Sequence, residues 1–300
     1  MNARPDPQLS LSERLTVIIP TFERTEMLAR AIDSVLAQPA VPRILVVDDG
    51  SDPPARLHRS DARLSLVRLE TNSGGAKARN YGAEQAVSPW ITFLDDDDEW
   101  LSETGALYDT VLVDEPQTDL CYVSGIEVVD PEGKTLEVRK AVSRSEGEAW
   151  FLEDTPSGSS HLTKQTFVIP AETYLRIGGF DTALESRIHS EFALRLNKVA
   201  KIRALEYATY RLHKHRQGQV SKDPGKRHRS FRYIWRKHER LIRSRPTQGA
   251  RWAQDHARRL FRESRTYDAL HALWLAFLLS PRSAATSLRI VASVAVRRMR

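Results

Sequence analysis

The chain has 300 residues, 41% of them hydrophobic, and a formal net charge of +6. This length and apolar content suit a globular domain with a smaller appendage and exclude a disordered or fibrous protein. Cys121 is the single cysteine, so an intrachain disulfide is excluded and a cytoplasmic protein is expected. The polar N-terminus and the shortness of the longest apolar run, residues 273–279, predict neither a signal peptide nor a spanning helix.

The first ordered unit is expected to begin at residue 15. Residues 1–14 are polar and contain two prolines, so we interpret them as a mobile arm. The run LTVIIP predicts a buried strand over residues 15–20. Thr21 is then expected to cap a helix that carries apolar residues at helical spacing as far as Leu36.

The run ILVVDDGS, residues 44–51, predicts a second buried strand followed by a turn. The strand ends in Asp48 and Asp49, and Gly50 forms the turn that follows. Strand, helix and strand in this order predict a parallel sheet with right-handed crossovers, which is an α/β fold. Because ligands bind at the carboxyl ends of such strands, Thr21 and the two aspartates are expected along one rim.

A glycine-containing loop, Asn72 to Gly75, follows a third strand candidate at residues 65–70. The helix expected from Ala76 has free N–H groups at its start, which suit an anion. Lys77 and Arg79 lie in its first turns and have two functional interpretations: they neutralise a diphosphate, or they hold an acidic loop in place. The structural alternative is a pair of solvated charges on the helix surface, with Arg79 paired to a surface carboxylate.

The run WITFLDDDDEW, residues 90–100, predicts a short buried strand that ends in four carboxylates. Adjacent carboxylates repel one another, and a hard divalent cation such as Mg²⁺ or Mn²⁺ relieves that repulsion. The alternative is a solvated acidic turn that opens a helix. The position of the run between an apolar strand and Trp100 favours a metal site.

Four motifs in order, VIIPTFERTEMLARAIDSVLAQ, ILVVDDGS, NSGGAKARNYGAEQA and WITFLDDDDEW, resemble those of family 2 glycosyltransferases. The similarity returns at residues 167–184, which end like the acceptor-side segment of that family, and at YRLHKH, residues 210–215. The resemblance implies a GT-A fold, a Rossmann-like and mostly parallel sheet flanked by helices, over residues 15–220. A basic helical C-terminal region is expected over residues 221–300.

The same resemblance implies an inverting transfer of a sugar from a nucleotide-diphosphate donor, UDP being expected, to an acceptor hydroxyl. A divalent metal, Mg²⁺ or Mn²⁺, stabilises the departing diphosphate in such a reaction. By residue-to-residue matching, the nucleoside pocket comprises Pro20, Thr21, Glu23 and Asp49, with Lys77 and Arg79 as further nucleotide contacts and Asp96 beside the ribose. The implied metal ligands are Asp95, Asp97 and the late histidine His213, with His215 a weaker candidate.

The catalytic base is the position at which the chain departs from the family. Counting back from Leu194, Arg195 and Leu196 places the usual Glu-Asp pair on Ile188 and His189, so the expected aspartate is absent. His189 and Glu191 remain as candidates. Glu191 lies four residues before Arg195 and is expected to form an ion pair with it, whereas a histidine suits proton removal at neutral pH. His189 is therefore the preferred base.

From residue 201 onward basic residues outnumber acidic ones by roughly four to one, and from residue 221 they alternate with aromatic residues. A solvated helix face that covers the main domain is one interpretation. Contact of the basic region with an anionic membrane is another interpretation. It suits an enzyme at the inner face of the membrane that uses saccharide or lipid-linked acceptors in polysaccharide or glycolipid assembly. A nucleic-acid-binding module is a third, but no recognised motif supports it and no nucleic acid is expected. A non-catalytic sugar-nucleotide-binding scaffold is the remaining alternative.

Overall fold

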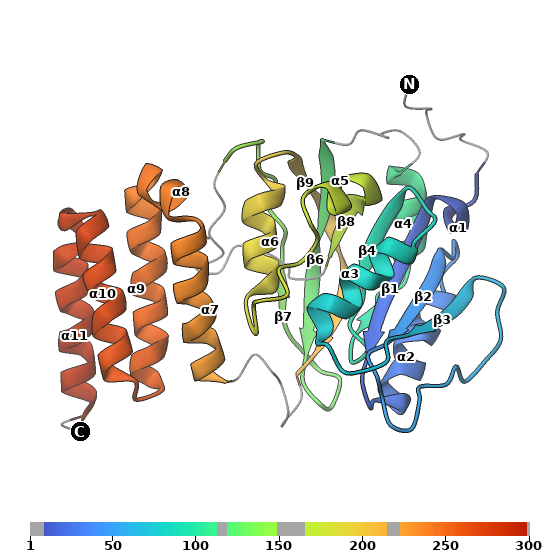
Figure 1. Cartoon of the computed structure of the whole chain (residues 1–300), viewed down its shortest axis with the longest axis horizontal. Helices are drawn as coiled ribbons and strands as arrows, with labels where there is room; N and C mark the ends of the chain where they lie inside the picture. The colour runs from blue at the N-terminus through green and yellow to red at the C-terminus, as the bar shows by residue number, and fades with distance from the viewer. Residues whose placement is uncertain (1–8, 113–118, 149–165, 215–222, 299–300) are drawn as a thin grey trace.

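A computed structural model describes residues 9–112, 119–148, 166–214 and 223–298, with side chains as far as residue 292. The first part of the chain forms a sheet with helices packed on it, and the last part forms a stack of helices beside the sheet (Figure 1). This is the α/β fold with a C-terminal helical region that the sequence predicts. The boundary predicted at residues 220–221 lies outside the described residues.

The strands form one sheet in the order β3, β2, β1, β4, β8, β6, β9, β5, with β7 paired to β6. Strands β1 to β4 are mutually parallel and β8 is antiparallel to both of its neighbours. Their bounds are β1 (Leu15–Thr21), β2 (Arg43–Asp48), β3 (Leu64–Arg68), β4 (Trp90–Phe93), β5 (Glu99–Trp100), β6 (Leu120–Val129), β7 (Thr135–Arg139), β8 (Phe167–Pro170) and β9 (Lys201–His213).

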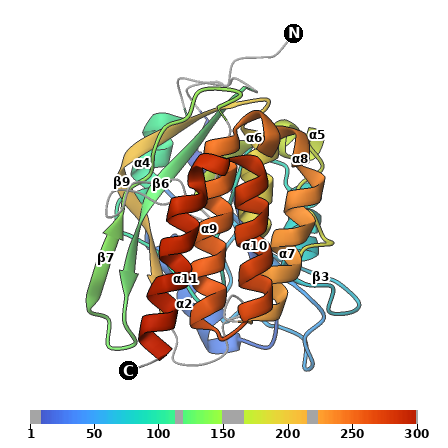
Figure 2. The same ribbon diagram turned by 90° about the vertical axis from the view of Figure 1, so that its left-hand side faces the viewer.

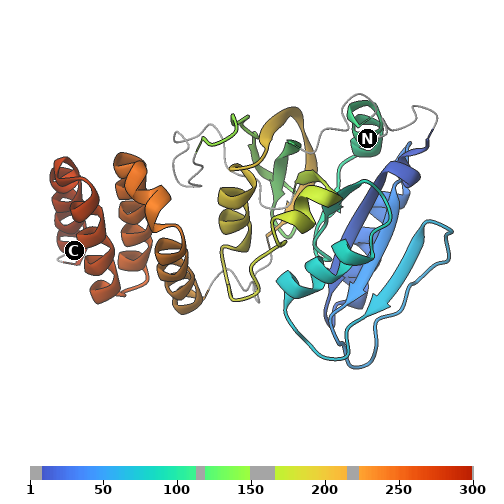
Figure 3. The same ribbon diagram turned by 45° about the horizontal axis from the view of Figure 1, so that its top comes forward.

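Helices cover both faces of this sheet. Alternate residues of β1 point to opposite faces, so Val17 packs in the core beneath α2 and α4, while Ile18 packs in the core beneath α3, α5 and α6. Figure 3 shows α3 and α5 lying over one face of the strands. The helices are α1 (Leu11–Arg14), α2 (Thr25–Leu36), α3 (Gly75–Gln85), α4 (Thr104–Val111), α5 (Ala171–Arg176) and α6 (Ile188–Leu196).

Two local expectations are wrong. Thr21 is the last residue of β1 rather than a helix cap, because α2 begins only at Thr25 after a turn in which Glu23 has a φ of 55°. Residues 11–14 of the expected mobile arm form α1 instead. Leu11 is buried there, and the Arg14 guanidinium donates to the Asp109 carbonyl over 3.0 Å. Residues 1–8 of that arm lie outside the described residues.

The C-terminal region consists of α7 (Pro224–Lys237), α8 (Glu239–Ser244), α9 (Pro246–Arg262), α10 (Thr266–Leu279), the short 3₁₀ helix η2 (Pro281–Ser283) and α11 (Ala284–Arg298). Its core contains Phe231, Trp252 and Leu260, which are aromatic and apolar residues of the basic segment, together with Leu194 of α6. These side chains are core residues and are not available for base stacking. Helices α10 and α11 form the layer at the end of the molecule (Figures 1 and 2). In the described part of the chain, we find no helix with the length and apolar character needed to cross a bilayer.

Candidate functional site

The candidate site lies along the rim where β1, β2 and β4 end, because these parallel strands bring their carboxyl ends to one edge of the sheet. The backbone N–H of Asp49, after β2, donates to the Thr21 carbonyl over 2.9 Å. The Thr21 hydroxyl donates to the Asp96 carboxylate, after β4, over 2.8 Å. The chain therefore joins the three predicted rim segments through direct hydrogen bonds.

Three carboxylates of the aspartate run converge at this rim. Asp95, Asp97 and Asp98 each offer an oxygen that lies within 4.8 Å of the others. The resemblance implied Asp95 and Asp97 as metal ligands, and it did not single out Asp98 from the rest of the run. Asp98 is buried, and its two oxygens accept from the Tyr210 hydroxyl and the His213 backbone N–H, each over 2.9 Å.

Burial and mutual repulsion act on the protonation of the aspartates. Burial raises the pKa of Asp96 to about 6, although Arg24 and Thr21 oppose that shift. Burial, together with the charges of Asp95 and Asp97, raises the pKa of Asp98 well above its usual range. A cation at this cluster would favour the ionised carboxylates, so the donor set fits a hard divalent ion that takes oxygen ligands.

Arginine side chains border the run on two sides. One Arg24 nitrogen donates to both Asp96 and Asp97, over 3.0 and 2.9 Å. Arg79 is 7% exposed, and its guanidinium forms an ion pair with Asp95. This ion pair is the contact that the loop-holding interpretation of Arg79 predicts, whereas Lys77 is exposed to solvent. The nucleotide contacts implied for both residues stay predictions.

His213 lies beside the aspartate run but contacts a different carboxylate. Its Nε2 is 3.0 Å from a Glu99 oxygen, while its backbone N–H is the group bonded to Asp98. Burial, followed by the charge of Arg30, lowers the pKa of His213, although Glu99 opposes the shift. His215 lies outside the described residues.

Asp49 organises the loop that precedes α3. Its two carboxylate oxygens accept the backbone N–H groups of Ser73 and Gly74, each over 2.8 Å. The anion found at the start of this helix is thus a side chain of the protein itself. Pro20 is buried within β1, and Glu23 donates its backbone N–H to the Ser51 hydroxyl over 3.0 Å. The nucleoside contacts implied for these residues stay predictions.

The two candidate bases lie on α6 in different surroundings. His189 is 8% exposed, and its ring packs edge-on against Phe180 with centroids 4.9 Å apart. Glu191 is fully buried and forms the predicted ion pair with Arg195, over 2.7 Å. Burial alone would raise the pKa of Glu191, but hydrogen bonds from His238, Arg195 and Lys237 lower it below its usual range. Glu191 is therefore held as an anion by three cationic or hydrogen-bonding partners.

The helical region holds the segment that leads into α6, a relationship that the sequence did not reveal. Lys237 of α7 forms ion pairs with both Asp181 and Glu191, and the Ser230 hydroxyl accepts the Ser186 backbone N–H over 3.1 Å. The ring of His256, on α9, lies 3.3 Å from an Arg187 nitrogen. The only signal in the sequence was the excess of basic residues after residue 221.

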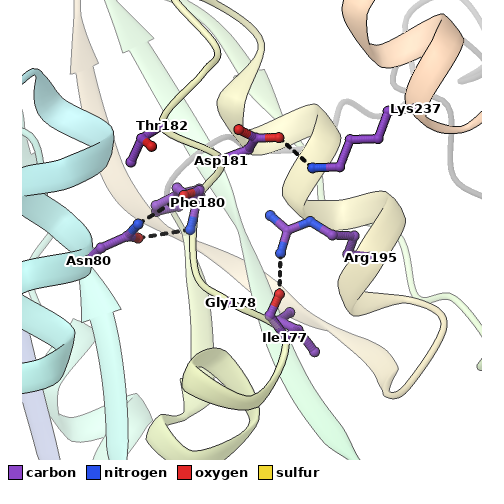
Figure 4. Close-up of a pocket in the computed structure, with 8 residues that line it drawn as sticks. All are labelled: Asn80, Ile177, Gly178, Phe180, Asp181, Thr182, Arg195 and Lys237. Atoms are coloured by element: carbon purple, nitrogen blue, oxygen red, sulfur yellow. Dashed lines mark hydrogen bonds and ion pairs between the residues drawn. The ribbon is translucent and has the colours of Figure 1, made fainter.

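A pocket of about 390 Å³ lies between α3, the turn after α5, α6 and α7. Figure 4 shows Asn80 bonded to Phe180 on one side and Lys237 paired with Asp181 on the other. Gly178 and Gly179 form the turn with φ values of 80° and 59°, a conformation that favours glycine. The lining contains no member of the aspartate run; it consists of Asn80, Ile177, Gly178, Phe180, Asp181, Thr182, Arg195 and Lys237.

Comparisons with known proteins agree with this architecture. Residues 16–141 match the family model described as Glycosyl transferase family 2. The chain is similar to an uncharacterized glycosyltransferase of Haemophilus influenzae, with 28% identity over 185 residues. It is also similar to the GalNAc(5)-diNAcBac-PP-undecaprenol beta-1,3-glucosyltransferase of Campylobacter jejuni, with 34% identity over 127 residues. The matched segments cover 61% and 40% of this chain, and the same shares of those relatives' own lengths.

A solved structure shares the fold over most of the chain. S. aureus TarS 1–349, crystallised in complex with UDP-GlcNAc, superposes with a TM-score of 0.53 at 17% identity. The match covers 91% of this chain and 92% of that one, so it includes much of the C-terminal helical region.

Proposed function

We propose that this chain, which matches the family 2 glycosyl transferase model over residues 16–141, transfers a sugar from a nucleotide-diphosphate donor to an acceptor hydroxyl. The observation that carries this proposal is the convergence of Asp95, Asp97 and Asp98 at the rim beside Thr21. The names of the relatives support the reaction class. Because the matches span only 61% and 40% of those relatives' lengths, the activity of the whole chain is a proposal.

The metal in this proposal is Mg²⁺ or Mn²⁺, held by Asp95 and Asp97 with Asp98 as a further oxygen donor. When bound, such an ion supplies positive charge to the phosphate oxygens of the leaving group. Arg24 forms ion pairs with Asp96 and Asp97, and its side chain is 37% exposed. It can therefore keep these ion pairs or bind a phosphate of the donor. We also propose that His213 lies near the ion, where its imidazole is oriented by Glu99.

We assign the base role to His189 and a positioning role to Glu191. The Glu191 carboxylate is fully buried and bonded to Arg195, Lys237 and His238, so removing a proton from an acceptor would require it to leave those partners. His189 lies two residues earlier on α6 and packs against Phe180 of the glycine turn. A single displacement with an acceptor hydroxyl activated by His189 gives inversion at the anomeric carbon.

We further propose UDP as the nucleotide and a lipid-linked or saccharide acceptor, used in cell-surface polysaccharide or glycolipid assembly at the inner face of the membrane. The UDP-GlcNAc bound to TarS and the undecaprenol-linked substrate in the Campylobacter relative's name support this choice. The pocket bounded by Asn80, Asp181 and Lys237 is our candidate for part of the acceptor site.

A donor screen tests the proposal. Purified full-length protein would be incubated with UDP-, GDP-, dTDP- and CMP-sugars and Mn²⁺, and the released nucleotide would be measured. We expect slow hydrolysis of one nucleotide-diphosphate sugar, which an acceptor accelerates. Tight binding of that donor with no turnover, even with acceptor extracts, would favour the non-catalytic scaffold instead.

A further inference from the structure

Helices α10 and α11 carry an apolar surface that the fold does not cover, which we call the α10–α11 face. On α10 its members recur at helical spacing, whereas Ala269, Ala272 and Ala276 on the other side of the helix are buried in the core. Tyr267 is 85% exposed, Trp274 55% and Leu288 70%. The face consists of Tyr267, Leu270, Trp274, Phe277, Leu278, Leu288 and Val291.

The location of this face leaves it accessible. In Figure 2, α10 and α11 lie side by side in front of α9, and Figure 1 shows them at the opposite end of the molecule from β1 to β3. Three aromatic side chains and four aliphatic ones are exposed on two helices that contact each other, and a group of exposed apolar residues of this kind marks an interaction site.

The charges on α10, η2 and α11 are mostly positive. Asp268 is the single acidic residue between positions 266 and 298, and it is paired with Arg265 and lies 3.3 Å from the His228 ring. Arg282 and Arg289 are exposed, and in the part of the chain that the structure describes neither has a carboxylate within ion-pair distance. The sequence adds Arg297 and Arg298 at the end of α11. An occupant of the face therefore meets positive charge with little acidic compensation.

We propose that the α10–α11 face docks on an anionic lipid bilayer. Tyrosine and tryptophan rings suit the boundary between headgroups and acyl chains, leucine and phenylalanine side chains insert below it, and the arginines meet lipid phosphates. Two copies of this chain pairing through the same face would bring Arg282 and Arg289 of both copies together without acidic partners, which disfavours a dimer. The biological role rests on the proposed function, because a lipid-linked acceptor requires the enzyme at a membrane.

Vesicle flotation of the full-length protein tests the proposal. We would compare phosphatidylcholine vesicles with vesicles containing phosphatidylglycerol, at low and high salt. The wild type is expected to float with the anionic vesicles, and Trp274→Ser combined with Phe277→Ser should weaken that binding by at least about tenfold. Tyr207→Ser is the matched control, because Tyr207 is 66% exposed on β9 outside the face.

The charge component has its own variant, Arg282→Gln combined with Arg289→Gln. Each arginine removed should weaken binding to anionic vesicles by about tenfold or less, and the binding should become less sensitive to salt. Nucleotide-sugar hydrolysis in solution should be unchanged in all of these variants, so a failure of docking is distinguishable from a failure of the proposed activity. The proposal would be overturned if the wild type bound neutral and anionic vesicles equally, or if the Trp274 and Phe277 variant bound like the wild type. It would also be overturned if the protein formed a concentration-dependent dimer, without binding lipid, and this variant abolished the dimer.

Discussion

The Lys237 ammonium group lies 2.8 Å from the carboxylate of Glu191, a side chain with no exposed surface. The same ammonium forms an ion pair with Asp181, at the glycine turn ten positions earlier in the chain. One residue of the helical region thus connects the two ends of the segment that contains His189. The helical region is in this way part of the architecture of the candidate site.

Replacing Lys237 with Met is expected to destabilise the protein and slow turnover. It leaves the buried Glu191 with two partners in place of three, and we expect a loss of about 1–3 kcal/mol in the free energy of unfolding, since Lys237 is partly exposed. Urea unfolding and steady-state kinetics would measure both effects. Lys237→Arg should recover most of the loss, and Arg236→Met, on the exposed neighbouring position, is the matched control. Wild-type stability and kcat in Lys237→Met would contradict the positioning role.

The ionisation of Glu191 should make the free energy of unfolding depend on pH. Its pKa is lower in the folded protein than in the unfolded chain, because the hydrogen bonds from His238, Arg195 and Lys237 outweigh its burial. Its contribution is therefore complete above the unfolded pKa, near 4.5, and is lost as the pH falls toward the folded value. The gap in urea midpoint between the wild type and Glu191→Gln should be largest at pH 7 and shrink below pH 4.5. A gap that does not change with pH would show that ionisation of Glu191 does not stabilise the fold.

His189→Ala should lose most turnover while keeping donor binding. A histidine base acts in its neutral form, so the wild-type rate should fall on the acidic side of the profile, and that limb should disappear from the residual rate of the variant. Glu191→Gln should lower stability more than it lowers turnover per folded molecule. Rates from pH 5 to 9, with the folded fraction measured in parallel, provide the comparison. If Glu191→Gln is inactive when folded and His189→Ala turns over normally, the base assignment is wrong.

The sequence predicted the fold well where apolar runs and their ends carry the information. The runs at residues 15–20 and 44–51 predicted two parallel strands, and the polar residues after them meet at one rim as expected. The turn after β1 was less predictable. Threonine is a common helix-capping residue, which favoured a cap at Thr21. Nothing in the local sequence indicated that Glu23 has a positive φ and that α2 begins only at Thr25.

The site was predictable only in part, because its contacts join distant segments. The Glu191–Arg195 pair lies within one helix, so spacing alone predicted it. The contact of Lys237 with Glu191 spans separate helices, and no periodicity connects them. Similarly, Asp98 appeared equivalent to its neighbours in the sequence, and only the hydroxyl of Tyr210 and the backbone of His213 distinguish it.

The most direct test of metal-dependent sugar transfer is donor turnover by wild type and Asp97→Asn, with and without a chelator. We expect turnover of the preferred nucleotide sugar with Mn²⁺ or Mg²⁺, reversible loss on adding EDTA, and no turnover by Asp97→Asn with an unchanged circular dichroism spectrum. Asp61→Asn, a carboxylate outside the rim that pairs with Arg63, is the control and should keep its activity. Full wild-type turnover in excess EDTA, or an active Asp97→Asn enzyme, would contradict the assignment of the aspartate run to a catalytic metal.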